Sequence, residues 1–246
     1  WFARDVLDAP CAILERVAGE TIARRLHRDQ RYGHAREVLA AQMGAALARI
    51  HSLNWRTDTL SFLPRRCRRG ASAVLAELGF YEQVMRRFSP DPHPALELGL
   101  RWLRQRAPQT RESTVIHGDY RLGNVIFTES GLAAVLDWEL AHIGDPMEDL
   151  TFLAIQAWRF GNDHLPIGGI GAWESFFDAY EQAGGREVER GQVRYWEVFG
   201  NMKWAVITIL QMVPFLDGTS PSIELASLGR KTAEVELQML TLMESA

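Results

Sequence analysis

Apolar side chains recur every three or four residues along much of the chain, which is the spacing of helices that bury one face. Between residues 35 and 51, for example, Val38, Leu39, Met43, Leu47 and Ile50 follow this pattern. The same periodicity predicts helices over 75–88, 96–106, 147–160, 173–183, 193–210 and 223–243. The segment at 147–160 follows Asp145 and Pro146, an N-cap candidate with proline in the first turn.

The pattern changes between residues 114 and 137, where short runs of β-type residues are separated by turns containing glycine. These runs span residues 114–117, 125–128 and 133–137. A further short apolar run at 12–17 ends at a glycine and is also predicted to be a strand. We therefore expect an α+β, mostly helical fold with a small β insertion in its middle.

Composition narrows the class of protein. With 246 residues, 47% of them hydrophobic, the chain can bury a sizeable core. Its formal net charge of -4 argues against nucleic acid as a partner. Two cysteines fit a reducing compartment, and no apolar run approaches the roughly 20 residues of a membrane span. We expect a cytoplasmic protein with no membrane partner. Its basic residues are almost all arginine, since Lys203 and Lys231 are the only lysines.

The segment that carries chemistry reads His-Gly-Asp-Tyr-Arg-Leu-Gly-Asn over residues 117–124, followed by Leu-Asp-Trp-Glu over 136–139. Asp119 and Asn124 stand five positions apart, on a loop that joins two predicted strands. Asp137 ends the next strand, so a tight hairpin would return it beside Asn124. Three oxygen-bearing side chains are therefore expected to converge at one edge of a small sheet.

Phosphoryl transfer requires such a group of side chains. The attacking hydroxyl must be held in line, and metal must neutralise the charge of the triphosphate. Mg²⁺ prefers hard oxygen ligands, and Asn124 and Asp137 are the candidate ligands. Asp119 is then the candidate catalytic residue that orients the acceptor hydroxyl and takes its proton.

The spacing of Asp119 and Asn124 matches the kinase catalytic loop, His-x-Asp with four residues before Asn. The sequence HGDYRLGNVIF, followed by VLDWELAHIGDPMEDL, resembles the motifs of the aminoglycoside phosphotransferase and choline kinase-like family. It is most similar to the branch associated with acyl-CoA dehydrogenases. The resemblance implies a protein-kinase-like fold, ATP and Mg²⁺ as cofactors, and a small-molecule hydroxyl acceptor. Asp137-Trp-Glu139 resembles the Asp-x-Asp/Glu of small-molecule kinases rather than Asp-Phe-Gly of protein kinases.

Residues 12–20, AILERVAGE, resemble the hinge between the two lobes of that family. The resemblance implies that backbone groups of Glu15 and Val17 contact the adenine edge. Residues 1–20 are then the end of an N-terminal lobe with the hinge strand, and residues 21–246 a helical C-terminal lobe. A kinase also needs a phosphate-covering loop and a lysine from the N-terminal lobe. Nothing before Ala12 supplies them, so we expect that lobe to be largely absent and this chain alone to be inactive.

Several other residues have both a functional and a structural interpretation. Glu139 either approaches a second metal or caps a turn, and Arg121 either touches a phosphate or is structural. His117 is expected to hold the loop by hydrogen bonds, and Asp145 and Asp149 to cap and anchor the following helix. His51 is expected to be a core histidine, the arginine run at 65–69 to be solvated, and residues 168–171 to be a plain loop. Four aromatic residues are expected either to pack in the core or to line an acceptor pocket: Tyr195, Trp196, Phe199 and Trp204.

The sequence leaves three functional hypotheses open. The main one is an ATP- and Mg²⁺-dependent phosphotransferase, whose acceptor is expected to be a hydroxyacyl-CoA or similar metabolite rather than a polycationic aminoglycoside. The second is a non-catalytic nucleotide- or ligand-binding module, or an inactive fragment. The third is a metal-dependent hydrolase that uses Asp119, Asp137 and His142. The sequence does not indicate the oligomeric state.

Overall fold

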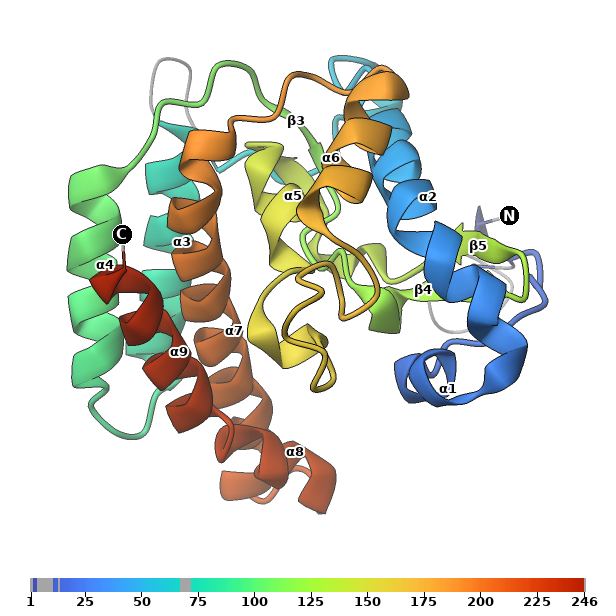
Figure 1. Ribbon diagram of the computed structural model, residues 1–246. Helices are drawn as coiled ribbons and strands as arrows, with labels where there is room; N and C mark the ends of the chain where they lie inside the picture. The colour runs from blue at the N-terminus through green and yellow to red at the C-terminus, as the bar shows by residue number, and fades with distance from the viewer. Residues whose placement is uncertain (1, 4–10, 13, 67–71, 246) are drawn as a thin grey trace.

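The computed structural model describes residues 2–3, 11–12, 14–66 and 72–245. Figure 1 shows a mostly helical molecule with a few short strands, as predicted. Its helices are α1 (Ala23–Arg28), α2 (Gly33–His51), α3 (Ala73–Phe88), α4 (Pro94–Arg106), α5 (Met147–Phe152), α6 (Trp173–Gln182), α7 (Val193–Leu216), α8 (Ile223–Gly229) and α9 (Thr232–Glu244).

The long helix α7 is the centre of the C-terminal half. It packs against α3, α4, α5, α8 and α9, and Figure 1 shows it crossing the molecule between them. Its residues from Tyr195 to Val206 are all buried. A second helix pair, α2 and α6, packs closely because α2 presents a glycine to its partner. A Cβ on Gly44 would lie 2.3 Å from the carbonyl oxygen of Phe176.

The strands form antiparallel pairs of two. β3 (Thr114–Ile116) pairs with β6 (His142–Gly144), β4 (Val125–Thr128) forms a hairpin with β5 (Gly131–Val135), and β1 (Phe2–Ala3) pairs with β2 (Cys11–Ala12). The predicted single small sheet is thus two separate pairs around the catalytic motif. Strand β6 was not predicted, since its partner β3 lies 26 or more residues earlier.

Several predicted boundaries were wrong. The strand predicted at 133–137 ends at Val135, which leaves Asp137 in the turn after it. The helix predicted at 147–160 ends at Phe152, and a 3₁₀ turn follows at Gln156–Trp158. Helix α7 runs six residues beyond position 210, and the helix predicted at 223–243 is interrupted between Gly229 and Thr232. Of the strand predicted at 12–17, residue 12 is in β2, residues 14–17 have no regular structure, and residue 13 lies outside the described residues.

One segment of the described chain, Arg190–Leu216, has the length and apolar composition of a membrane span. Its most apolar window has a mean hydropathy of 1.2, and 61% of that window is buried inside the protein. The sequence expectation concerned an uninterrupted apolar run of about 20 residues, and this segment is interrupted by Arg194, Glu197 and Lys203. Packing against five neighbouring helices gives the apolar residues of α7 a place in the core.

Candidate active site

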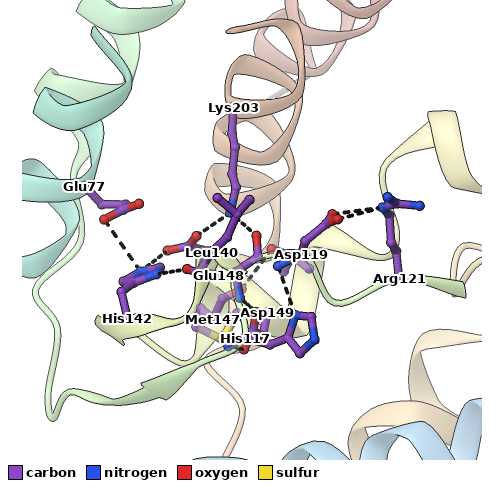
Figure 2. Close-up of polar contacts among 12 residues, drawn as sticks. Glu77, His117, Asp119, Arg121, Leu140, His142, Met147, Glu148, Asp149 and Lys203 are labelled. Carbon is purple, nitrogen blue, oxygen red and sulfur yellow. Dashed lines mark hydrogen bonds and ion pairs between the residues drawn. The ribbon is translucent and has the colours of Figure 1, made fainter. Parts of the chain in front are cut away.

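Asp119 lies on the loop between β3 and β4, in contact with Asn124. The amide nitrogen of Asn124 donates to the main-chain oxygen of Asp119 at 2.9 Å and to its Oδ2 at 2.5 Å. Arg121 Nε lies 2.9 Å from Asp119 Oδ1 and 3.1 Å from Oδ2, as Figure 2 shows. Asn124 is buried, whereas the Asp119 side chain keeps 14% of its surface exposed. The carboxylate is therefore held from one side and open on another.

The β4–β5 hairpin brings the next motif back to the same place. The backbone N–H of Leu136 donates to the carbonyl of Asn124 at 2.8 Å, and Asp137 follows directly. Asp137 is exposed and adopts φ 64°, ψ 64°, in the left-handed region that few residues other than glycine occupy. Aspartate tolerates this conformation. The strand ends two residues earlier than predicted, yet the hairpin still returns Asp137 to the neighbourhood of Asn124.

His117 has a structural role in the loop, as the sequence suggested. Its Nε2 lies 2.8 Å from the carbonyl oxygen of Leu136, and its Nδ1 lies 3.2 Å from the backbone nitrogen of Asp119. A neutral ring that carries its proton on Nε2 satisfies both partners. The imidazole thus joins the Asp119 loop to the hairpin that carries Asp137.

Asp149 anchors the same loop from the protein interior. It is fully buried on α5 and accepts the backbone N–H groups of His117 at 2.7 Å and Gly118 at 2.9 Å. His51 Nε2 lies 3.2 Å from Oδ2, the oxygen that also accepts from His117, and His51 Nδ1 lies 2.9 Å from the hydroxyl of Tyr180. Burial alone would raise the pKa of Asp149, but the hydrogen bond and charge of His51 lower it below its ordinary value. The charged carboxylate is therefore the form that holds the loop.

A second group of charges, buried among α3, β6, α5 and α7, was missed by the sequence analysis. Lys203 Nζ lies 2.7 Å from Glu148 Oε1 and also donates to the carbonyl of Gly118. His142 Nε2 lies 3.3 Å from Glu148 and 3.6 Å from Glu77, and Figure 2 shows His142 and Lys203 meeting at Glu148. Arg66 pairs with Glu77. The signal for this group was a lysine inside an apolar helical stretch of a chain that otherwise uses arginine.

The charges of this group determine its protonation. Burial would raise the pKa of Glu148, but the charge of Lys203 dominates and lowers it to about 2. Burial would lower the pKa of His142, and the neighbouring Glu148 carboxylate instead raises it. For Glu77, burial and the charge of Glu148 both raise the pKa. Both carboxylates already have a side-chain cation as partner.

Glu77, His142 and Glu148 have ligand atoms close enough together to surround a metal ion. Lys203 and Arg66 already balance the two carboxylates, so a divalent ion would add two uncompensated positive charges to a buried site. We therefore interpret the group as an ion-pair network. Because His142 belongs to this network and is 1% exposed, it does not join Asp119 and Asp137 as the hydrolase hypothesis required.

The remaining residues singled out from the sequence lie partly on the surface and partly in the core. Glu15 and Val17 lie exposed in the irregular segment at 14–18, and their role as a hinge stays a prediction. Glu139 is exposed as well. Asp145 is buried and caps helix α5 by accepting the backbone N–H of Met147 at 3.0 Å. Arg65 and Arg66 of the arginine run are described, whereas positions 67–69 lie outside the described residues.

The aromatic residues of α7 divide into two groups. Tyr195, Trp196 and Phe199 pack on one another in the core. Trp204 instead packs on Trp158, with ring centroids 4.6 Å apart, and the guanidinium of Arg121 lies 4.7 Å from the centroid of Trp158. Trp204 also lines a cavity of about 420 Å³ between the 156–161 segment, α7 and α9. This cavity thus adjoins the aromatic pair on which Arg121 rests.

The comparisons with known proteins show the family of the chain and its fold. A family model described as the Phosphotransferase enzyme family matches residues 2–196. Acyl-CoA dehydrogenase family member 10 of Mus musculus is 30% identical over 119 residues, which are 48% of this chain and 11% of that protein. Acyl-CoA dehydrogenase family member 11 of Homo sapiens is 32% identical over 112 residues, 44% of this chain and 14% of that protein. The chain thus spans only a small part of the length of these curated relatives.

Solved structures share the fold. A protein of Ralstonia eutropha JMP134 described as an aminoglycoside phosphotransferase has a TM-score of 0.75 at 24% identity, over 94% of this chain and 72% of that chain. A choline/ethanolamine kinase family protein of Mesorhizobium loti has a TM-score of 0.53 at 18% identity, over 84% and 66%. The ternary complex of APH(2″)-IIa with streptomycin and ATP has a TM-score of 0.52 at 15% identity, over 79% and 62%.

Proposed function

The chain belongs to the Phosphotransferase enzyme family, and from this we propose that it transfers the γ-phosphoryl group of ATP to a hydroxyl of a small molecule. The observation that carries the proposal is the contact between Asp119 and Asn124, in which Asn124 Nδ2 lies 2.5 Å from Asp119 Oδ2. Asp149 fastens the loop that carries both residues to the core. A carboxylate that is fixed in direction and partly exposed can receive the proton of an acceptor hydroxyl. ATP as the donor is supported by a structural neighbour solved with ATP.

In the proposed reaction the acceptor oxygen forms a bond to the γ-phosphorus, and the bond from that phosphorus to the bridging oxygen breaks. ADP leaves with the electron pair, and the hydroxyl proton passes to an Asp119 oxygen and then to water. Asn124 keeps the Asp119 carboxylate in place, since its amide donates to both the main chain and the side chain of that residue. Arg121 adds a positive charge beside the same carboxylate.

The residues present fit a magnesium ion. With its nitrogen turned to Asp119, Asn124 offers its amide oxygen, and the exposed Asp137 offers a carboxylate two residues after the end of β5. These are the hard oxygen ligands that Mg²⁺ takes, together with water and phosphate oxygens. When bound, Mg²⁺ neutralises charge on the triphosphate.

The acceptor is proposed to occupy the cavity beside Trp204. Its lining combines aromatic and aliphatic side chains with amides and one residue of each charge, Lys231 and Glu234. Such a lining suits an acceptor with an apolar body better than a polycation. Hydroxyacyl-CoA esters and similar metabolites are therefore the first acceptors to test, and the names of the curated relatives support this choice.

For the adenine of ATP we propose the segment around Glu15 and Val17. Both residues are exposed in a segment without regular structure, so their backbone groups are accessible to a planar base. The phosphate-covering loop and the lysine of a kinase are not among the residues that the structure describes.

The test is ATP consumption by the intact protein, with Mg²⁺ and a panel of hydroxyacyl-CoA esters, choline-like amines, sugars and aminoglycosides. We expect ADP and one phosphate ester, identified by mass spectrometry, to form in equal amounts with one class of acceptor. ADP formation at the same rate without any acceptor would indicate a hydrolase. ATP binding measured by calorimetry, with no turnover for any acceptor, would favour the non-catalytic binding module.

A further inference from the structure

Lys203 is a buried charge that the proposed reaction does not use. Its side chain, on α7, is 0% exposed, and the ammonium lies between the Glu148 carboxylate and the carbonyl of Gly118. The rings of Phe152 and Tyr81 lie 4.8 and 5.4 Å from the same nitrogen. An ammonium without water costs several kcal/mol unless it is well paired. Its place in the structure therefore depends on these partners.

Gly118 immediately precedes Asp119 and has little freedom. Its φ is +84°, and a Cβ at this position would lie 2.5 Å from the carbonyl oxygen of Leu140. Its N–H is held by Asp149 at 2.9 Å, and its carbonyl accepts from Lys203. That carbonyl belongs to the peptide unit that joins Gly118 to Asp119. The ammonium therefore fixes the plane of the peptide bond that leads into Asp119.

The same peptide unit is held at its other end by His117. The N–H of Asp119 donates to His117 Nδ1 at 3.2 Å. A peptide unit is planar, so a bond at its oxygen and a bond at its nitrogen together define its rotation. Loss of the oxygen contact would leave one weak bond to resist rotation about the glycine ψ angle. The direction of the Asp119 side chain depends on that rotation.

The ion-pair network keeps Lys203 in this position. Glu148 binds the ammonium through Oε1 and faces His142 through Oε2. His142 is in turn held by the carbonyl of Leu140 at 2.9 Å. Each residue has a partner from a different element, so the position of the ammonium is set by the core and not by α7 alone.

We propose that Lys203 is a positioning residue for phosphoryl transfer: it orients the Gly118–Asp119 peptide and, through it, the Asp119 carboxylate. This inference rests on the proposed function. Lys203 supplies a cationic contact from α7 to the catalytic loop, and the next residue of that helix, Trp204, lines the proposed acceptor cavity. One turn of α7 thus contacts both the catalytic loop and the wall of the cavity.

The first test is amide hydrogen exchange of the intact protein, followed by mass spectrometry of peptides that cover residues 114–124. We expect Lys203→Met to speed exchange of the loop amides by about 10-fold or more, because the loop opens more often. The control is Leu100→Ala, a buried change on α4 away from the loop. It should destabilise the protein without a selective effect on these peptides. Equal exchange of the loop in Lys203→Met and wild type would overturn the proposal.

The second test is kinetic, at a temperature where all variants are folded. Misplacement of a reacting group lowers kcat, so we expect Lys203→Met to lose about 10–100-fold in kcat with a KM for ATP within about threefold of wild type. Leu100→Ala should keep kcat near that of wild type. A kcat for Lys203→Met near that of wild type, or an equal loss in Leu100→Ala, would contradict a positioning role.

Lys203→Met leaves Glu148 buried without its main partner and can fail to fold. The double variant Lys203→Met with Glu148→Gln removes both charges and avoids that imbalance. We expect it to recover thermal stability while kcat stays at least about 10-fold low, since Gly118 still lacks its donor. Recovery of kcat together with stability would show that only folding was affected, and would overturn the proposal. Should the wild type prove to have no transfer activity, the proposed function fails, while the exchange experiment still decides whether Lys203 holds the loop.

Discussion

The carboxylate of Asp149 accepts the backbone N–H of His117 at 2.7 Å, which fastens the catalytic loop to helix α5. The same carboxylate accepts from Gly118, so two consecutive amides turn toward one buried anion. Such amides have no access to water, and each loses its only partner if the carboxylate is removed. The loop therefore derives its conformation from a buried residue that lies 32 and 31 positions after the two amides it holds.

Asp149→Asn is expected to lower the free energy of unfolding by roughly 2–4 kcal/mol, because an amide can accept fewer of these bonds and leaves a buried donor unsatisfied. Urea unfolding followed by circular dichroism measures the change. Asp178→Asn is the matched control, since that side chain on α6 is 53% exposed and should change stability by less than about 0.5 kcal/mol. Equal stabilities for the two variants would show that Asp149 does not anchor the loop.

Asp119→Asn is expected to lower kcat by about 10²–10⁴-fold, because the amide cannot receive the hydroxyl proton. The fold should be retained, since Asp119 is partly exposed and Asn124 can still donate to its main-chain oxygen. Initial rates of phosphate ester formation measure the effect, with thermal unfolding as the check on folding. A variant with near-normal kcat would remove Asp119 from the mechanism.

Asp137→Asn tests the metal site separately from the base. Without the carboxylate, the Mg²⁺ concentration that gives half-maximal rate should rise by at least about 10-fold. Asp119→Asn should leave this concentration nearly unchanged. Titration of Mg²⁺ at saturating ATP distinguishes the two residues. The assignment of Asp137 as a metal ligand would be wrong if both variants required the same Mg²⁺ as the wild type.

The sequence was sufficient to predict the local parts of the site. The spacing of Asp119 and Asn124 within one loop, and the hairpin that returns Asp137, depend on turns only a few residues long. The structure places Asn124 against Asp119 and Leu136 against Asn124, as that reasoning required. The helix with apolar positions 38, 39, 43, 47 and 50 was likewise found, because its periodicity is uninterrupted.

The parts that depend on distant segments could not be predicted. Strand β6 exists because His142–Gly144 pairs with β3, and at three residues β6 is too short to be recognised alone. Lys203 is 85 residues from Gly118 and 55 from Glu148, so no local pattern connects them. Helix α5 ends early although its apolar pattern continues, and residues 153–155 are buried in a turn that leads to the 3₁₀ turn at Gln156–Trp158. Packing overrides periodicity in that segment.

Two glycines in helices test the packing of the fold. Gly44→Ala should destabilise by about 2 kcal/mol or more, since its Cβ would clash with the carbonyl of Phe176 and force α2 away from α6. Gly79→Ala on α3 meets nothing within 4 Å and should stabilise by about 0.5–1 kcal/mol through higher helix propensity. Urea unfolding of both variants measures the opposite signs. Destabilisation by both changes would contradict the α2–α6 contact as the cause.

The acid stability of the protein should depend on Glu148. Its pKa is lowered from 4.5 to about 2 in the folded protein. The unfolded chain therefore binds a proton there at higher pH than the folded chain does. The stabilisation from the charged carboxylate is complete above about pH 4.5 and is lost as the pH falls toward 2. Glu148 alone should account for roughly 2–4 kcal/mol of the loss over this range.

Glu148→Gln isolates this contribution, because the variant has no proton to bind at this position. Its free energy of unfolding should be lower than that of wild type at pH 6, and should fall less steeply between pH 4.5 and 2.5. Lys203 and His142 face Glu148 from α7 and β6, and the Glu148 carboxylate raises the pKa of both in the wild type, so the measured difference in slope includes any change in their proton binding. Glu77, on α3, has a pKa raised by burial and by the charge of Glu148. Urea unfolding at closely spaced pH values gives the two slopes. If the free energies of unfolding of the two proteins fell in parallel with pH, Glu148 would not be ionised in the folded state. The ion pair of Glu148 with Lys203 would then be wrong.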